Sequence, residues 1–185
     1  MNLFQEISEN KFVLVLLSEK QYEEKLAELM RKIEKDHTKI CYVCLSKPYG
    51  DTIEYLQSNG LDVGKFFFID MLTSHYKSPR KAENCIFIEA PGKLIALQVA
   101  ISKAVSEKNC SVVVFDTLSS LLMYEQTHDI VKFTHQVTIE ESNRNINKVF
   151  IVLKEGNLPQ EYSQAFIKDV EMFADKKIEF LEEEE

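Results

Sequence analysis

The chain has 185 residues, of which 45% are apolar, and 30 acids against 22 bases give it a formal net charge of -8. This length predicts one domain, whose core removes roughly 70% of the unfolded surface from water. The excess of acids argues against a nucleic-acid partner, because binding phosphates requires clustered Lys and Arg. Local basic stretches exist, such as "KSPRK" at 77–81, but a stretch of this kind is more often a solvated loop.

Strand and helix signals alternate through the first half of the sequence. The predicted elements are, in chain order, a strand at 11–17, a helix at 19–37, a strand at 38–46, a helix at 49–60 and a strand at 65–70. In the first helix Tyr22, Leu26, Leu29 and Ile33 recur at helical spacing and predict its inward face. Gly60 is a plausible stop for the second helix, because glycine readily adopts the left-handed conformation that ends helices.

The second half continues the alternation after a long polar segment at 71–84, which we expect to be a surface loop. The remaining predicted elements are a strand at 85–90, a helix at 92–109, a strand at 110–116, a helix at 125–145, a strand at 147–156, a helix at 158–175 and an edge strand at 176–180. The run of acids at 181–185 predicts a disordered tail. The whole pattern predicts one α/β domain over 1–180, with three layers: a mostly parallel central sheet and helices on both faces.

No apolar run approaches the roughly 20 residues of a membrane helix, so no membrane partner is expected. The start "MNLFQEISEN" lacks the basic region of a secretory signal, and a soluble cytoplasmic protein is the expectation. Cys41 and Cys44 fall three apart in a predicted strand, which places them on opposite faces of the sheet. We therefore expect buried thiols, Cys85 and Cys110 included, and no metal site.

A phosphate-binding loop would be expected between the first strand and the first helix, with glycines and a Lys. That junction reads "LLSEKQYEEKL" and contains no glycine, so the Walker A pattern is absent. Its acids Glu19, Glu23 and Glu24 suit a helix N-terminus and occupy, electrostatically, the place of a phosphate. Lys20 is either a remnant of a phosphate-binding lysine or an ordinary surface lysine.

A second Gly-Lys pair lies in "EAPGKLIAL" at 89–97. It has one glycine, and Leu94 stands where Ser or Thr would bind magnesium. This stretch is better explained as the start of a helix.

The stretch "SVVVFDTLSSLL" at 111–122 ends a buried strand in Asp116. Such an acid can hold a metal, cap the following turn, or accept hydrogen bonds from Thr117 and Ser119. Without a phosphate-binding loop, the capping role is favoured. We expect no catalytic residue, and the vestigial candidates for nucleotide binding are Ser18, Lys20, Asp116 and Thr117.

Several segments, in order, resemble the RecA superfamily and in particular its KaiC-like archaeal branch. They are "TKICYVCLSKPYGDTIEYLQSNGLDVGKFFFIDMLT", "PGKLIALQVAISKAV", "SVVVFDTLSSLL", which is similar to a Walker B strand, and "KVFIVLKEG". The resemblance covers roughly residues 11–180 and implies the fold of the P-loop NTPases without the P-loop. A nucleotide-hydrolysing member would also carry a catalytic Glu near Ser46, where this chain reads "CLSKPYG".

The resemblance, together with these departures, implies a non-catalytic RecA/KaiC-like domain that acts as a binding or regulatory module. It looks like small archaeal proteins described as RecA-like ATPase relatives in signal transduction. RecA-like domains often assemble side by side, so a protein partner or self-association is expected, and no cofactor. Two alternatives stay open: binding of ATP and magnesium without hydrolysis, and an enzyme of another class with a site at the 71–84 loop.

Overall fold

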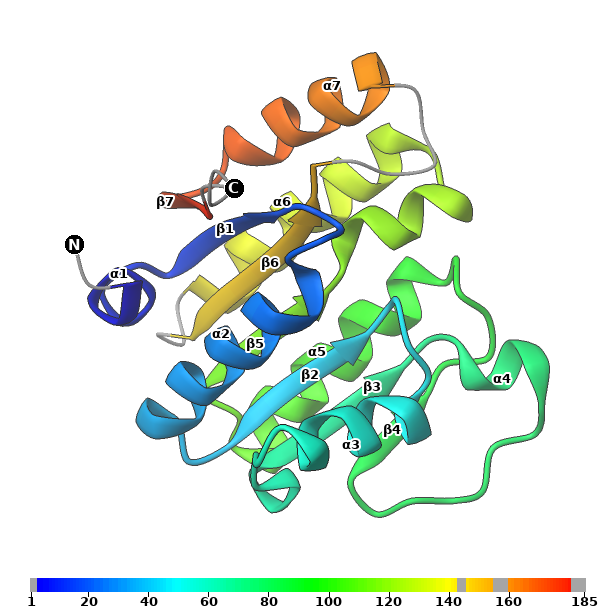
Figure 1. Ribbon diagram of the computed structural model, residues 1–185. Helices are drawn as coiled ribbons and strands as arrows, with labels where there is room; N and C mark the ends of the chain where they lie inside the picture. Colours follow the sequence, from blue (N-terminus) through cyan, green and yellow to red (C-terminus); the bar gives the residue numbers. More distant parts are fainter. Residues whose placement is uncertain (1–2, 143–145, 155–159, 181–185) are drawn as a thin grey trace.

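The computed structural model describes residues 3–142, 146–154 and 160–180 (Figure 1). Its centre is a sheet of seven strands in the order β4-β3-β2-β5-β6-β1-β7, with every strand pair parallel. The strands are β1 (Phe12–Leu17), β2 (Ile40–Cys44), β3 (Phe66–Asp70), β4 (Cys85–Phe87), β5 (Val112–Asp116), β6 (Asn147–Leu153) and β7 (Lys176–Glu179).

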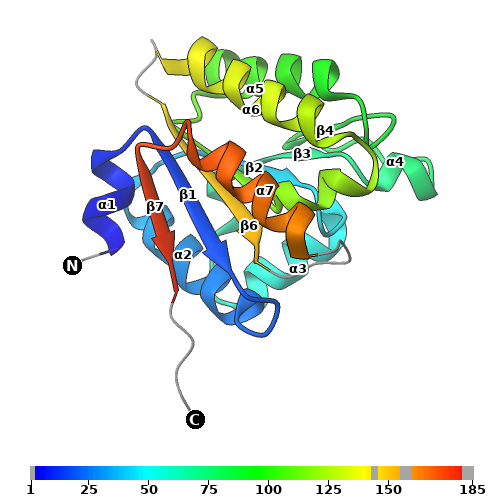
Figure 2. The ribbon, with the colours of Figure 1, turned by 90° about the horizontal axis from the view of Figure 1, so that it is seen from above.

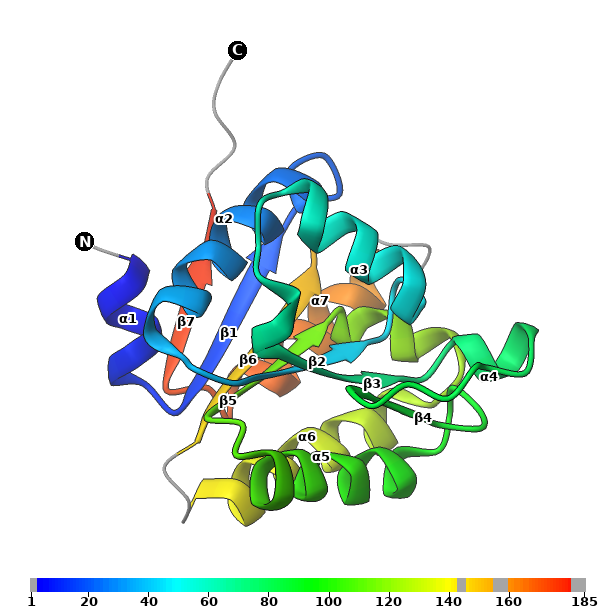
Figure 3. The same ribbon diagram turned by 90° about the horizontal axis from the view of Figure 1, so that it is seen from below.

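Helices cover both faces of this sheet, which confirms the predicted three-layer α/β fold. The helices are α1 (Leu3–Glu9), α2 (Tyr22–Asp36), α3 (Tyr49–Ser58), α4 (Thr73–Tyr76), α5 (Leu94–Lys108), α6 (Thr127–Ser142) and α7 (Gln160–Glu171), with 3-10 turns η1 (Val63–Lys65) and η2 (Leu118–Met123). Figure 3 shows α2 and α3 on one face and α5 and α6 on the other, and Figure 2 shows α7 beside α6. The helices change face because right-handed crossovers run first from β1 toward β4 and then back toward β7.

The strands have continuous apolar runs because helices bury both of their faces. Every residue of β1, β2, β3 and β5 is buried. Under α5, α6 and α7 the rings of Phe115 and Phe150 stack with centroids 4.2 Å apart. Under α2 and α3, Tyr42 and Phe68 belong to one apolar cluster with Leu26 and Leu29 of α2. The core therefore consists of two apolar layers separated by the sheet.

The cysteines are arranged as predicted. Cys41 packs in the layer under α5, and Cys44 packs in the layer under α2 and α3. All four cysteines are free and buried. Burial raises the pKa of each thiol, that of Cys110 to about 11 and those of Cys41 and Cys44 further.

We expect these thiols to be unreactive in the folded protein, because only the thiolate attacks and burial suppresses it. A colorimetric thiol reagent at pH 8 should therefore detect almost no thiol in native buffer. In denaturant it should detect all four cysteines. Rapid reaction of the native protein at the same pH would contradict this burial.

Local differences from the sequence prediction lie at the ends of elements. The 71–84 segment contains the one-turn helix α4, and the 3-10 turn η2 follows β5; neither was predicted. The predicted start of the first helix at 19 was wrong, since α2 begins at Tyr22. Gly60 has φ +77° and follows α3, which confirms it as the stop. The acidic tail at 181–185 lies outside the described residues, and within them no helix is long and apolar enough to cross a membrane.

Candidate functional site: a buried carboxylate at the strand ends

The carboxyl ends of β1, β2 and β5 form the region in which a ligand would be expected. Cys44 pairs in register with Asp116 of β5 on one side and with Asp70 of β3 on the other. After β2 the chain continues to α3 on one face of the sheet. After β5 it continues to α6 on the other face. Such a topological switch point opens a crevice in most α/β sheets, and ligands bind there.

The loop after β1 forms a tight turn. Buried Ser18 donates from its hydroxyl to the side-chain oxygen of Gln21 at 3.1 Å. The Gln21 amide donates back to the Ser18 carbonyl at 3.2 Å, and the Tyr22 amide donates to the Glu19 carbonyl at 3.4 Å. These two amides are used within the turn, so they are not presented to a phosphate in the crevice.

The Asp116 carboxylate is held by two tyrosines. The Tyr22 hydroxyl donates to one carboxylate oxygen, and the Tyr42 hydroxyl donates to the other. Tyr22 also lies within hydrogen-bond distance of Ser46, with the two hydroxyl oxygens 3.0 Å apart. Asp116 is only 1% exposed. A hydrated magnesium ion therefore has no access to this carboxylate unless Tyr22 moves away.

The main chain holds the same acid in place. The amides of Leu45 and Ser46 both donate to the carbonyl of Asp116, at 2.9 and 3.0 Å. Burial raises the pKa of the Asp116 carboxyl, and the tyrosine hydrogen bonds and the nearby Lys47 charge partly offset that rise. Burial and the Asp116 charge raise the pKa of both tyrosines, so they remain protonated donors.

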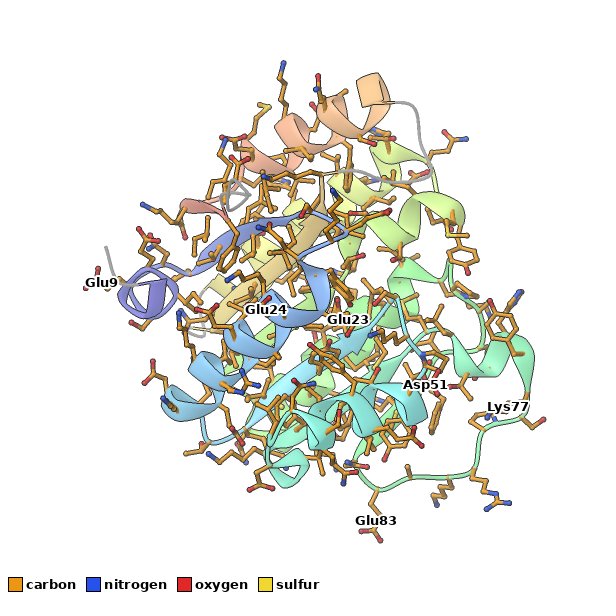
Figure 4. All side chains as sticks on the ribbon, viewed as in Figure 1. Glu9, Glu23, Glu24, Asp51, Lys77 and Glu83 are labelled. Atoms are coloured by element: carbon orange, nitrogen blue, oxygen red, sulfur yellow. The ribbon has the colours of Figure 1, made fainter. Side chains whose placement is uncertain are left out.

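Lys47 and Glu23 cover this cluster from outside. The Lys47 ammonium forms an ion pair with Glu23 and lies 4.5 Å from the ring centroid of Tyr55 and 5.5 Å from that of Tyr22. The Tyr55 hydroxyl donates to the Glu23 carbonyl at 2.5 Å. These contacts join α2 to α3 across the end of β2, and Glu23 lies on the first turn of α2 (Figure 4). We call Tyr22, Tyr42, Asp116, Lys47 and Glu23 the tyrosine plug.

The other predicted site residues stand apart from this chemistry. Lys20 is exposed and, within the described residues, makes no ion pair or hydrogen bond with a side chain. Thr117 is buried, and its hydroxyl oxygen lies 3.0 Å from that of Ser120. The Ser119 hydroxyl accepts from the Leu153 amide at 2.9 Å.

The interpretation of Asp116 as a cap was therefore wrong. The turn η2 that follows β5 has no side-chain cap at its start, and the tyrosines are the partners of the carboxylate. Sequence reasoning missed Tyr42. Its presence in a fully apolar strand was a usable signal, because a buried tyrosine hydroxyl almost always requires a partner.

The Gly-Lys pair at 92–93 starts a helix, as expected. Lys93 precedes α5 and pairs with Glu89 at 2.7 Å. Gly92 and Lys93 line a hollow of about 660 Å³ together with the acids Glu125 and Asp129. Its acids Glu125 and Asp129 are matched by the bases Lys93 and Lys132, so the hollow carries no excess of positive charge for a phosphate.

A second acid, Asp70, has a structural role at the end of β3. It is fully buried and accepts from the Tyr49 amide at 2.7 Å, the Leu72 amide at 2.6 Å and the Thr73 amide at 2.8 Å. The Thr73 hydroxyl donates to it as well, at 2.5 Å. One carboxylate therefore fixes the first turns of both α3 and α4.

In the described part of the chain, no group of three or more His, Cys, Asp or Glu side chains is placed to hold a metal ion. No protein-family model matches this sequence. No curated protein matches it either. Among solved structures, the KaiC-like protein PH0186 from the hyperthermophilic archaeon Pyrococcus horikoshii OT3 is similar, with a TM-score of 0.65 over 97% of this chain and 77% of that chain. The two sequences are 15% identical, so the likeness establishes a KaiC-like RecA fold and leaves function open.

Proposed function

We propose that this protein is a RecA/KaiC-like domain without ATPase activity, which acts as a binding or regulatory module. The observation that supports this most directly is the tyrosine plug, in which both oxygens of the Asp116 carboxylate accept from tyrosine hydroxyls. An active ATPase needs the acid of this strand free to position magnesium, a glycine-rich loop and a base for water. Here both oxygens of that acid accept from tyrosines, the junction after β1 contains no glycine, and the stretch "CLSKPYG", where the catalytic Glu is expected, contains no carboxylate.

We propose that such a module binds another protein or a second copy of this chain. Ile95 is 80% exposed and Val99 is 52% exposed, one turn apart on α5, and Ile139 on neighbouring α6 is 54% exposed. Exposed apolar side chains on a helix are typical of protein contact surfaces when they adjoin, as Ile95 and Val99 do. By resemblance to archaeal RecA-like relatives, we extend the proposal to a role in signal transduction.

Thermal unfolding with ATP, measured with magnesium and again with EDTA, tests the closed site. Magnesium-ATP at 100 times its dissociation constant would add about 2.7 kcal/mol, a shift of roughly 5–10 °C for this length. We expect no magnesium-dependent shift and no phosphate release, because the plug excludes the ion from Asp116.

The Asp116→Asn variant is the matched control. A magnesium-dependent shift that this variant abolishes would contradict the proposal and favour nucleotide binding without hydrolysis. Steady phosphate release by the unmodified protein that Asp116→Asn abolishes would show an ATPase.

A further inference from the structure

A hollow of about 720 Å³ lies at the carboxyl ends of β2, β3 and β4, apart from the tyrosine plug. Its walls come from the start of α3, from α4 with the segment after it, and from the end of β4. The residues that matter are Tyr49, Asp51, Tyr76, Lys77, Arg80 and Phe87. Pockets for small molecules commonly measure about 300–1,000 Å³ and occur at this edge of α/β sheets. Its size and place are therefore those of a ligand site.

The inner wall of the hollow is aromatic and firmly packed. Tyr49 packs edge-on against Phe87, with centroids 5.6 Å apart, and against Phe68 at 5.2 Å. The Tyr49 hydroxyl donates to the side-chain oxygen of Asn84 at 2.6 Å. Asp70 also bonds to the first turns of α3 and α4, so both sides of the hollow are held by one buried carboxylate. This wall exists before any ligand arrives.

The outer wall carries unused positive charge. Lys77 and Arg80 are exposed, and within the described residues neither forms an ion pair or a side-chain hydrogen bond. The ring of Tyr76, beside Lys77, is 70% exposed. The Arg80 guanidinium and the Lys77 ammonium can pair with an anionic group, and the exposed ring of Tyr76 can pack on an aromatic one. Together they suit a ligand that carries both.

Asp51 sets the direction of such a ligand. It lies on α3, across the hollow from the segment after α4 that carries Lys77 (Figure 4). Repulsion from the Asp51 carboxylate keeps an anionic group on the side of Lys77 and Arg80. Hydroxyl or amino groups of the ligand would then face Asp51, which can accept their hydrogen bonds.

From this arrangement we propose that the hollow binds a small aromatic anion, in which a planar ring packs on Tyr49 and Tyr76 and a phosphate or carboxylate pairs with Lys77 and Arg80. A nucleoside monophosphate and a simple aryl phosphate share this chemistry. Binding here needs no magnesium and does not involve Asp116. The site is independent of the tyrosine plug, and it stands or falls separately from the proposed function.

Calorimetric titration in EDTA tests the proposal, with AMP and phenyl phosphate as probes; adenosine or phenol and inorganic phosphate are the separate halves of each probe. We expect at least one aromatic phosphate to bind, and both halves to bind about tenfold more weakly or worse. The double variant Lys77→Gln, Arg80→Gln should weaken binding by at least about tenfold. Lys81→Gln, on the same segment but outside the hollow, should change it by less than about twofold.

A second variant blocks the space without removing charge. Gly50 lies in the first turn of α3, and a Cβ added there meets nothing within 4 Å. Gly50→Phe should therefore fold normally and place its ring in the hollow, which abolishes binding. Binding that survives both this variant and the charge variant would overturn the proposal. So would the absence of binding by both aromatic phosphates at millimolar concentration, or equal binding by the separate halves.

Discussion

Replacing Asp70 with Ala is expected to lower the free energy of unfolding by about 3–4 kcal/mol. Asp70 is fully buried and accepts from the Tyr49, Leu72 and Thr73 amides and from the Thr73 hydroxyl. Truncation leaves these donors in a dry interior without a partner, and each such loss costs about 1–3 kcal/mol before the structure relaxes. Urea denaturation measures the change, and thermal melting should fall by about 10 °C.

Asp62→Ala is the matched control for Asp70→Ala. Asp62 is exposed, and its carboxylate accepts from the Gly64 amide at 2.9 Å at the start of η1. Loss of an exposed cap of this kind costs about 1 kcal/mol. Equal destabilisation by the two variants would contradict the role assigned to Asp70.

A folded Asp70→Ala protein should also bind the probes of the hollow more weakly, because the two sides of the hollow lose their common anchor.

Removing the Tyr42 hydroxyl, in Tyr42→Phe, is expected to cost about 1.5–3 kcal/mol at pH 7. The hydroxyl is buried and donates to the Asp116 carboxylate, and hydrogen bonds to a charged acceptor are the strong ones. Tyr55→Phe is the control. Its hydroxyl donates to the neutral Glu23 carbonyl at the surface, so this variant should cost about 1 kcal/mol or less, with no dependence on pH.

The cost of Tyr42→Phe should depend on pH in a defined direction. Burial raises the pKa of Asp116 above its ordinary value of 3.8, so the folded protein holds this proton more tightly than the unfolded chain. The stability that protonated Asp116 contributes is therefore fully present below pH 3.8, and it is lost as the pH rises through the raised pKa of the folded protein. Tyr42→Phe removes a hydrogen bond that lowers the pKa of Asp116, so the folded pKa should be higher in this variant. The variant should therefore lose more stability than the wild type as pH rises, and lose it up to a higher pH.

Urea denaturation between about pH 4 and 8 tests this dependence, and the difference between wild type and Tyr42→Phe should widen as pH rises. Asp116→Asn cannot ionise and should lack this part of the pH dependence. A cost of Tyr42→Phe that stays constant over the range would show that the hydroxyl does not bond to an ionised carboxylate.

The sequence by itself determined the layers of the fold. The runs Phe12–Leu17 and Val112–Phe115 are apolar at every position, and that pattern is typical of strands in a sheet covered on both faces. The inward face of α2 followed from the spacing of Leu26, Leu29 and Ile33, all of which are buried. Gly60 ended α3 because a local backbone requirement, a positive φ, selects glycine. These features depend on periodicity and local conformation, which a single sequence carries.

Only the tertiary structure decided what Asp116 does. Its partners Tyr22 and Tyr42 lie 94 and 74 residues away in the sequence, and no local pattern relates them. The hollow beside Tyr49 likewise joins segments from the ends of three strands. These side chains meet because of the order of the strands in the sheet and the register in which the strands pair. Neither is encoded in a local stretch of sequence. The glycine-free junction after β1 was visible in the sequence, and the fold identified the two tyrosines that bond to Asp116.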